Sequence, residues 1–134
     1  MEDIIESIPK TMEKFLGCTG KMVKPSPDTV EALVGKIRKG DVATVSQLRE
    51  RIAKDFKVDT ACPAATLKAL QLISKKGKAK CYWRIVKAKG ELISKFPGGA
   101  EGQAELLLGE GHKIDFSKKV PVVIDYESKL SVFA

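Results

Sequence analysis

The sequence predicts a mainly α-helical fold with a small β wing, arranged as a winged helix-turn-helix. Three amphipathic segments with helix start and stop signals follow one another between residues 26 and 77, and short runs rich in β-branched and aromatic residues come after them. The chain has 134 residues, about the size of one domain. We expect a winged-helix domain over residues 26–114, with an N-terminal helical arm at 1–25 and a C-terminal extension at 115–134.

The first residues predict the helical arm. Ile4, Ile5, Ile8, Met12 and Phe15 recur at roughly helical spacing, although a proline interrupts the pattern. The segment begins with acidic residues and lacks the continuous apolar run of a secretory signal. An apolar run of ~20 residues, as a membrane helix requires, is also missing from the sequence. We therefore expect a cytoplasmic protein that does not enter a membrane.

Three helices are predicted from their ends. The first begins with Ser26 as N-cap and Pro27 at the first helical position, and stops at Gly40. The second covers residues 45–56, behind the capping box of Thr44 and Gln47. The third opens at Thr60 or Cys62, has a proline in its first turn, and ends at residue 77.

The third helix has one apolar and one polar face. On a helical wheel its apolar side carries Leu67, Leu70 and Ile73, and its opposite side carries Lys68, Gln71 and Lys75. The preceding helix and this one have the order of a helix-turn-helix, in which the second helix enters a DNA groove.

The segments after the third helix predict the wing and a further helix. Residues 81–93 are expected to form two short strands around Lys89 and Gly90. A fourth helix is expected over residues 100–111, with Ala104, Leu107 and Leu108 facing inward. Residues 120–126 are expected to form a late strand or an extended tail.

Basic charge is concentrated in one segment. Residues 68–89 contain eight lysines and arginines in total and no acidic residue. The net charge of the whole chain is +7, so the net charge of all other residues together is −1. Such a cluster is typical of a surface that contacts the phosphate backbone of nucleic acid. A solvated lysine face that serves solubility is an equal alternative.

The three cysteines indicate neither a disulfide framework nor a zinc site. Cys18, Cys62 and Cys81 are an odd number and form no CxxC pair. We expect no metal and no cofactor. Cys18 and Cys62 are interpreted as small buried hydrophobes.

Four blocks, in order, carry a resemblance to a known family. They are "GDVATVSQL" at 40–48, "PAATLKAL" at 63–70, "YWRIV" at 82–86 and "PGGAEGQAELLLGEGH" at 97–112. Over about residues 27–114 the chain resembles the C-terminal domain of the 6-O-alkylguanine-DNA alkyltransferases. It is closest in character to the alkyltransferase-like branch, which keeps the DNA-binding domain but lacks the reactive cysteine.

The resemblance implies that the reacting groups are missing. Active members move the alkyl group onto a cysteine in a Pro-Cys-His-Arg-Val motif, where the histidine acts as base. Matching the shared arginine to Arg84 places Tyr82 at the cysteine position, Trp83 at the histidine position and Cys81 at the proline position. The single histidine, His112, matches another family position. We therefore expect that the protein is not an enzyme. The alternative is an alkyltransferase that uses Cys81.

The resemblance also implies two sets of site residues. The DNA-binding residues are expected to be Ala65, Thr66, Lys68, Gln71, Lys75 and Arg84. The lesion pocket is expected to contain Val45, Tyr82, Trp83, Pro97, Gly98, Gly99 and Glu110. Two positions depart from the family: Val45 replaces a pocket tyrosine, and Thr66 replaces the arginine that fills the gap left by a flipped base. Glu110 is expected to accept a hydrogen bond from Trp83 or Arg84.

These observations together predict a monomeric DNA-binding protein without enzymatic activity. It is expected to bind 6-O-alkylguanine in duplex DNA and to flag the lesion for a repair partner. The alternatives are the Cys81 alkyltransferase and a winged-helix DNA-binding or regulatory module without lesion specificity.

Overall fold

The N-terminal arm is a β-hairpin that encloses a short helix. The computed structural model describes residues 2–76 and 81–130 and shows strand β1 (Ile4–Ser7), helix α1 (Lys10–Leu16) and strand β2 (Lys21–Lys24). β1 and β2 pair antiparallel, with Ile4 opposite Lys24. The prediction of a helical arm is therefore wrong outside α1. Pro9 bars a helix from running through it, and β-branched residues such as Ile4 and Ile5 favour a strand.

Helix α2 (Pro27–Val34) begins as expected and ends early. The Ser26 hydroxyl accepts a hydrogen bond from the Thr29 N–H at 3.3 Å. Gly35 is its C-cap, with an N–H that donates to the Glu31 carbonyl. The helix thus stops before Gly40, because glycine has a low helix propensity.

Helix α3 (Val45–Phe56) has the predicted bounds. The Thr44 hydroxyl accepts from the Gln47 N–H at 3.1 Å, and the Gln47 side chain accepts from the Thr44 N–H at 2.9 Å. This reciprocal capping box follows strand β3 (Ala43–Thr44). After α3, strand β4 (Thr60–Ala61) pairs parallel with β2 and completes a three-stranded sheet of order β1-β2-β4.

Helix α4 (Pro63–Ser74) follows directly, with Cys62 as its N-cap. Leu70 and Ile73 are buried as expected, and Leu67 is partly buried against the core. The expected helix end at Gly77 lies outside the described residues.

The expected two-stranded wing is not formed around Lys89 and Gly90. Tyr82–Arg84 is a 3-10 turn, and strand β5 (Ile85–Val86) pairs parallel with β3. Ala88–Gly90 is another 3-10 turn, after which Glu91 bridges to Val122. β3 thus takes the place beside β5 that the second wing strand was expected to fill, and Glu91 of that expected strand bridges to the C-terminal segment.

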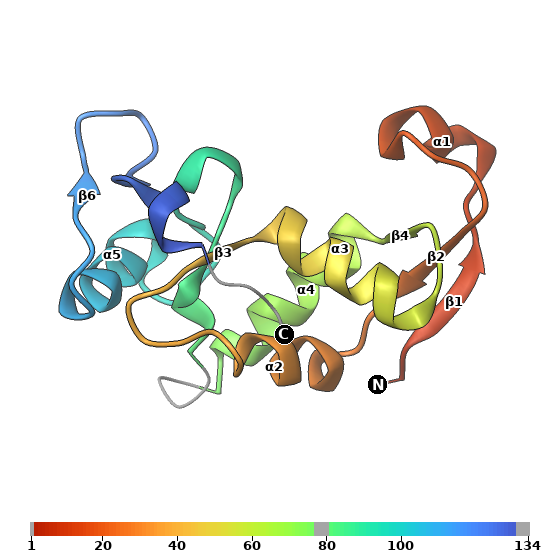
Figure 1. The fold of residues 1–134 in the computed structure, drawn as a ribbon, viewed down its shortest axis with the longest axis horizontal. Coiled ribbons are helices and arrows are strands. Elements are labelled where there is room, and N and C mark those ends of the chain that lie inside the picture. The colour runs from red at the N-terminus through yellow and green to blue at the C-terminus, as the bar shows by residue number, and fades with distance from the viewer. Residues whose placement is uncertain (1, 77–80, 131–134) are drawn as a thin grey trace.

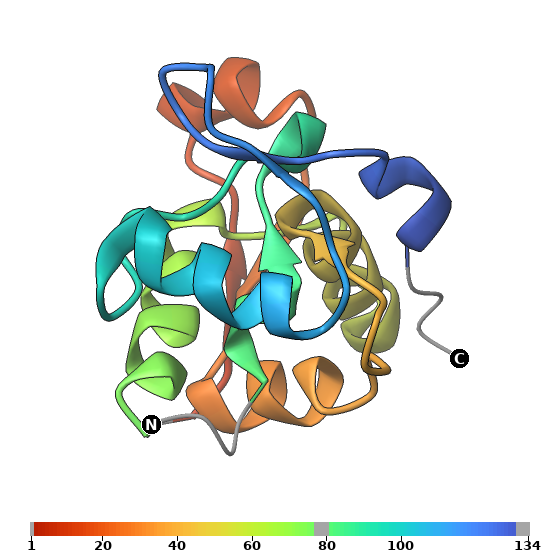
Figure 2. The same ribbon diagram turned by 90° about the vertical axis from the view of Figure 1, so that its left-hand side faces the viewer.

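The remaining elements cover the end of the molecule opposite the hairpin (Figure 1). They are helix α5 (Gly99–Gly109), strands β6 (Ile114–Asp115) and β7 (Val122–Val123), which pair antiparallel, and a 3-10 turn at Tyr126–Lys129. Seen from that end, β5 lies between α5 and α3 (Figure 2). Ala104 and Leu107 are buried as expected, but Leu108 is exposed, so its predicted inward position is wrong. Of residues 120–126, only β7 is strand.

The fold is mainly helical with small sheets around one large core. That core runs from Val23 on β2 to Val123 on β7. A second, smaller cluster joins Ile8, Met22 and Cys62 between the hairpin and the start of α4. None of the described helices has both the length and the apolar character that crossing a bilayer requires. The division of the chain at residues 25 and 114 stays a prediction.

Candidate nucleic-acid interface

The outer face of α4 is basic and open. Lys68 and Lys75 are exposed, and Gln71 beside them is half-buried. Lys76 forms an ion pair of 3.3 Å with Glu31 on α2. At the start of the helix the small side chain of Ala65 is half-buried and packs against the cluster of Ile8, Met22 and Cys62. The predicted contacts Ala65, Lys68, Gln71 and Lys75 therefore belong to one helix.

Thr66 is not part of this face. Its side chain is fully buried, and its hydroxyl donates to the Cys62 carbonyl at 2.8 Å. A hydroxyl bonded to the carbonyl four residues earlier is a common arrangement for threonine inside a helix. The prediction that Thr66 contacts DNA is thus wrong for this structure.

Arg84 is largely buried and forms hydrogen bonds to two other parts of the chain. Its Nε lies 3.0 Å from Oε1 of Glu110, and its Nη2 lies 2.6 Å from Oε2. Its Nη1 donates to the Ile37 carbonyl at 2.7 Å. The two charged side chains are only 11% and 8% exposed. Arg84 is therefore not available to a phosphate, which corrects its predicted role, whereas its hydrogen bond to Glu110 is confirmed.

Burial and Arg84 shift the pKa of Glu110 in opposite directions. Burial raises the pKa of the carboxyl, but the hydrogen bonds and the charge of Arg84 hold that pKa below its ordinary value. The same hydrogen bond raises the pKa of Arg84. The pair is ionised at neutral pH and joins the end of α5 to the turn that follows α4.

Tyr82 and Trp83 are buried and packed together. Their ring centroids are 5.4 Å apart with an edge-on arrangement, and Tyr82 meets Phe96 in the same way at 4.9 Å. Burial raises the pKa of the Tyr82 phenol. Trp83 Nε1 is buried and has no hydrogen-bond partner within the described part of the chain. Both rings are thus part of the large hydrophobic core.

The other predicted pocket residues lie at helix starts. Gly98 and Gly99 begin α5 with φ of 79° and 68°, a conformation that glycine adopts without strain. Pro97 and Gly98 are exposed, and Val45 is half-buried at the start of α3.

Gln103 is a central residue that the sequence analysis missed. Its fully buried side chain accepts from the Ile93 N–H at 2.7 Å and donates to the carbonyls of Trp83 and Ile85 at 2.9 and 2.7 Å. It therefore fixes the backbone around Tyr82–Arg84, called the aromatic turn below. Its position four residues before Leu107, on the inner face of the predicted helix, was the signal that could have identified it.

Cys81 lacks the surroundings of an activated nucleophile. It has φ of 54° and is half-buried beside the aromatic turn. No hydrogen bond joins it to a base among residues 2–76 and 81–130, and His112 is itself buried. Burial lowers the pKa of His112. The described residues also contain no cluster of three or more His, Cys, Asp or Glu side chains suited to a metal ion.

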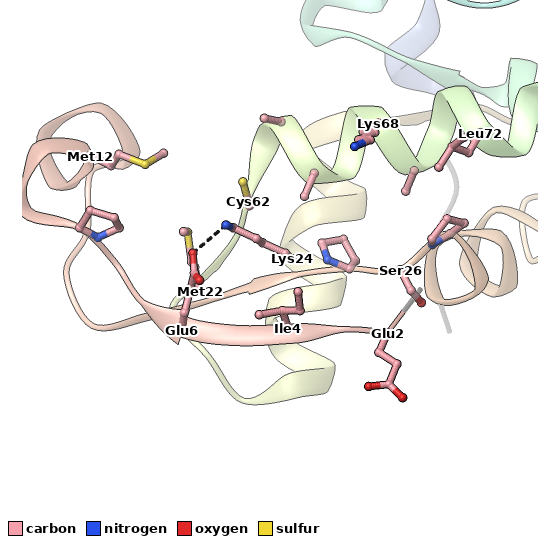
Figure 3. Close-up of a pocket in the computed structure, with 16 residues that line it drawn as sticks. Glu2, Ile4, Glu6, Met12, Met22, Lys24, Ser26, Cys62, Lys68 and Leu72 are labelled. Carbon is pink, nitrogen blue, oxygen red and sulfur yellow. Dashed lines mark ion pairs between the residues drawn. The ribbon is translucent and has the colours of Figure 1, made fainter.

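A groove of about 520 Å³ lies elsewhere, between the N-terminal hairpin and α4 (Figure 3). Its walls include Met12, Met22 and Leu72, and Ala65 and Lys68 also border it. None of the residues predicted for the lesion pocket lines this groove.

Comparison with known proteins identifies a similar fold. No protein-family model matches the sequence, and no curated protein matches it. Among solved structures, the chain is similar to S. pombe Atl1, an alkyltransferase-like protein whose crystal structure is a complex with damaged DNA containing O6-carboxymethylguanine. The TM-score is 0.59 at 16% identity, over 79% of this chain and 94% of that one. The predicted resemblance is thus confirmed at the level of the fold.

Proposed function

We propose that this chain is a DNA-binding protein of the alkyltransferase-like kind, which holds 6-O-alkylguanine in duplex DNA and does not transfer the alkyl group. The observation that carries the proposal is the likeness in fold to Atl1, which extends over 94% of that chain. Atl1 was crystallised with damaged DNA, and alkyltransferase-like proteins lack transfer activity.

In this proposal α4 is the recognition helix of a helix-turn-helix, and α3 is the helix before it. Lys68 and Lys75 neutralise phosphates, Gln71 lies between them, and Ala65 allows close approach at the start of the helix. The absence of acidic residues from 68–89 supports this assignment, because phosphates meet no like charge along that segment.

The aromatic turn accounts for the proposed absence of transfer. Tyr82 and Trp83 take the positions of the cysteine and the histidine in the active family. A phenol whose pKa is raised by burial is a poor nucleophile, and an indole N–H cannot accept a proton. Holding a lesion without reacting with it leaves a persistent complex that another repair protein can recognise.

The proposed lesion pocket must open before a base can enter. Tyr82 packs against both Trp83 and Phe96, so a flipped guanine has to move at least one of these rings. Beside the rings, Gly98 is exposed and Gly99 is half-buried, and Glu110 stays fixed by Arg84.

A second candidate is a DNA-binding module without lesion specificity. The burial of Thr66 favours it, because no long side chain at that position fills the gap that a flipped base leaves in the stack. Both candidates share the same α4 surface, and they differ in whether an alkylated guanine improves binding.

Fluorescence anisotropy with two labelled duplexes separates the candidates. The duplexes share one sequence, and one contains 6-O-methylguanine in place of a single guanine. We expect tighter binding of the lesion duplex and a steep fall of both affinities with salt. Equal affinities would favour the module without lesion specificity, and weak, salt-independent binding would contradict DNA binding by α4.

A further inference from the structure

The proposed DNA face of α4 continues into the groove beside the N-terminal hairpin. Lys68 lines this groove from α4, and Lys24 lines it from β2. Figure 3 shows the strands of the hairpin along one side of the groove and α4 along the other. Nucleic acid that lies over the first two turns of α4 therefore borders the hairpin as well.

The hairpin is held in place beside the start of α4. The N–H of Cys62, the N-cap of α4, donates to the Val23 carbonyl at 2.8 Å, one residue before Lys24. β1 is tied to the start of α2 as well, because Oδ1 of Asp3 accepts from the Ser26 N–H at 2.7 Å. The position of Lys24 relative to α4 is thus set by backbone hydrogen bonds.

In the free protein Lys24 is already paired with an acidic residue. Its Nζ lies 2.9 Å from Oε1 of Glu6, and the two side chains are 40% and 39% exposed. An ion pair this exposed is weak and can give way to another anion. Among the described residues, the charged ones that line the groove are Glu2, Glu6, Lys24 and Lys68, so their charges sum to zero. Glu6 thus offsets the charge that Lys24 would otherwise present to a phosphate.

We propose that the hairpin is a second DNA-contacting wall, in which Lys24 binds a backbone phosphate and Glu6 competes with that phosphate for Lys24. When DNA binds, Lys24 exchanges the carboxylate for a phosphate, and Glu6 turns toward solvent. Glu6 therefore lowers the affinity for damaged and undamaged duplexes alike, because a phosphate contact carries no sequence information. This inference rests on the proposed DNA binding by α4, and adds to it a second surface and a residue that limits affinity.

Two substitutions at the ion pair should change DNA affinity in opposite directions. Glu6→Gln should tighten binding of undamaged and lesion duplexes by about threefold at low salt, and Lys24→Ala should weaken both by about as much. Both substitutions break the same ion pair, so a merely structural role of the pair predicts a change in the same direction in both variants. Fluorescence anisotropy measures the affinities, and higher salt should shrink both effects.

Control variants separate a local contact from an effect of net charge. Glu105→Gln, at an exposed position on α5, changes the net charge by the same amount as Glu6→Gln, and Lys119→Ala does so for Lys24→Ala. Both controls should change the affinity much less than the ion-pair variants. Equal effects of Glu6→Gln and Glu105→Gln, or changes of the same sign in Glu6→Gln and Lys24→Ala, would overturn the proposal.

Lys68→Ala separates a failure of this inference from a failure of the proposed function. If Lys68→Ala weakens DNA binding while both ion-pair variants bind like wild type, the hairpin lies outside the interface and this inference alone is overturned. If the wild-type protein binds neither duplex, the inference and the proposed function are overturned together.

Discussion

Arg84 joins three parts of the chain through one side chain. It forms a two-bond ion pair with Glu110 at the end of α5 and donates to the Ile37 carbonyl after α2, while it sits in the turn that follows α4. Its guanidinium also lies 5.7 Å from the Trp83 ring centroid. Arginine suits this position because its planar group makes several directed hydrogen bonds at once.

Removing the carboxylate of this pair should destabilise the protein strongly. In Glu110→Gln the charge of Arg84 stays buried without a counter-ion, and losses of about 3 kcal/mol are usual in such cases. Urea unfolding measures the change. As a control, Asp55→Asn breaks an ion pair of 3.0 Å with Arg51 that is much more exposed, and it should cost far less. Equal losses in the two variants would show that Glu110 has no special role.

Acidification should destabilise the protein in two steps. Burial lowers the pKa of His112 in the folded state below its ordinary value of 6.5, so the unfolded chain binds more protons as the pH falls through 6.5. The free energy of unfolding therefore decreases below pH 6.5. Glu110, whose pKa is lowered from 4.5, adds a second decrease below pH 4.5. Urea midpoints from pH 8 down to about pH 2 measure both steps.

The variant His112→Asn should lose the first step and keep the second. If wild type and variant showed the same pH dependence between pH 7 and pH 5, the buried histidine would not be its source.

Cys81 should not accept an alkyl group. No described base is bonded to it, and its half-buried thiol lies in a turn held by the Gln103 hydrogen bond to Trp83. Intact mass after incubation with a 6-O-methylguanine duplex should equal the mass of the untreated protein. A gain of one methyl group that disappears in Cys81→Ala would establish the alkyltransferase alternative.

At the level of elements, the helices were predictable because their signals are local. Ser26, the Thr44 and Gln47 capping box, and Pro63 mark three helix starts that the structure confirms. The hairpin and the wing were not predictable in this way, because their partners are distant in sequence. β2 pairs with Thr60–Ala61, and β5 pairs with Ala43–Thr44.

The same contrast holds for the candidate site. The Arg84 and Glu110 contact followed from the family resemblance, and the structure confirms it. The burial of Thr66 was derivable from the helical pattern, because Thr66 lies four residues before Leu70 and seven before Ile73 and so shares their buried face. It was missed because the family resemblance placed this position against DNA. The spacing to Leu107 placed Gln103 on the inner face of α5, but its hydrogen-bond partners Trp83, Ile85 and Ile93 are distant in the sequence and could not be read from it.

The outer face of α4 should determine how strongly DNA binding depends on salt. Lys68→Ala and Lys75→Ala should each weaken binding of undamaged and damaged duplexes alike, and each should reduce the slope of log affinity against log salt by about one. Lys119→Ala, at an exposed position in the β6–β7 loop, is the matched control and should change neither quantity. Anisotropy titrations at several salt concentrations measure the slopes. An effect of Lys119→Ala equal to that of Lys68→Ala would argue against α4 as the contact.

At the scale of the whole molecule, the proposed DNA contacts and the proposed lesion site lie on different elements. The basic face of α4 is proposed for DNA, and Tyr82–Arg84 for the lesion. The likeness to Atl1 covers 79% of this chain, so about a fifth of it lies outside the matched part.

The most direct test of the central claim is the fluorescence of Trp83, the only tryptophan in the chain. Emission spectra are recorded with saturating undamaged duplex and with the same duplex containing 6-O-methylguanine, with saturation checked by anisotropy. A base that enters the pocket must disturb the rings of Tyr82, Trp83 and Phe96, whereas DNA bound on α4 alone leaves them buried. We predict a change in intensity and emission maximum with the lesion duplex and none with the undamaged one. Identical spectra with the two duplexes would contradict lesion binding at the aromatic turn.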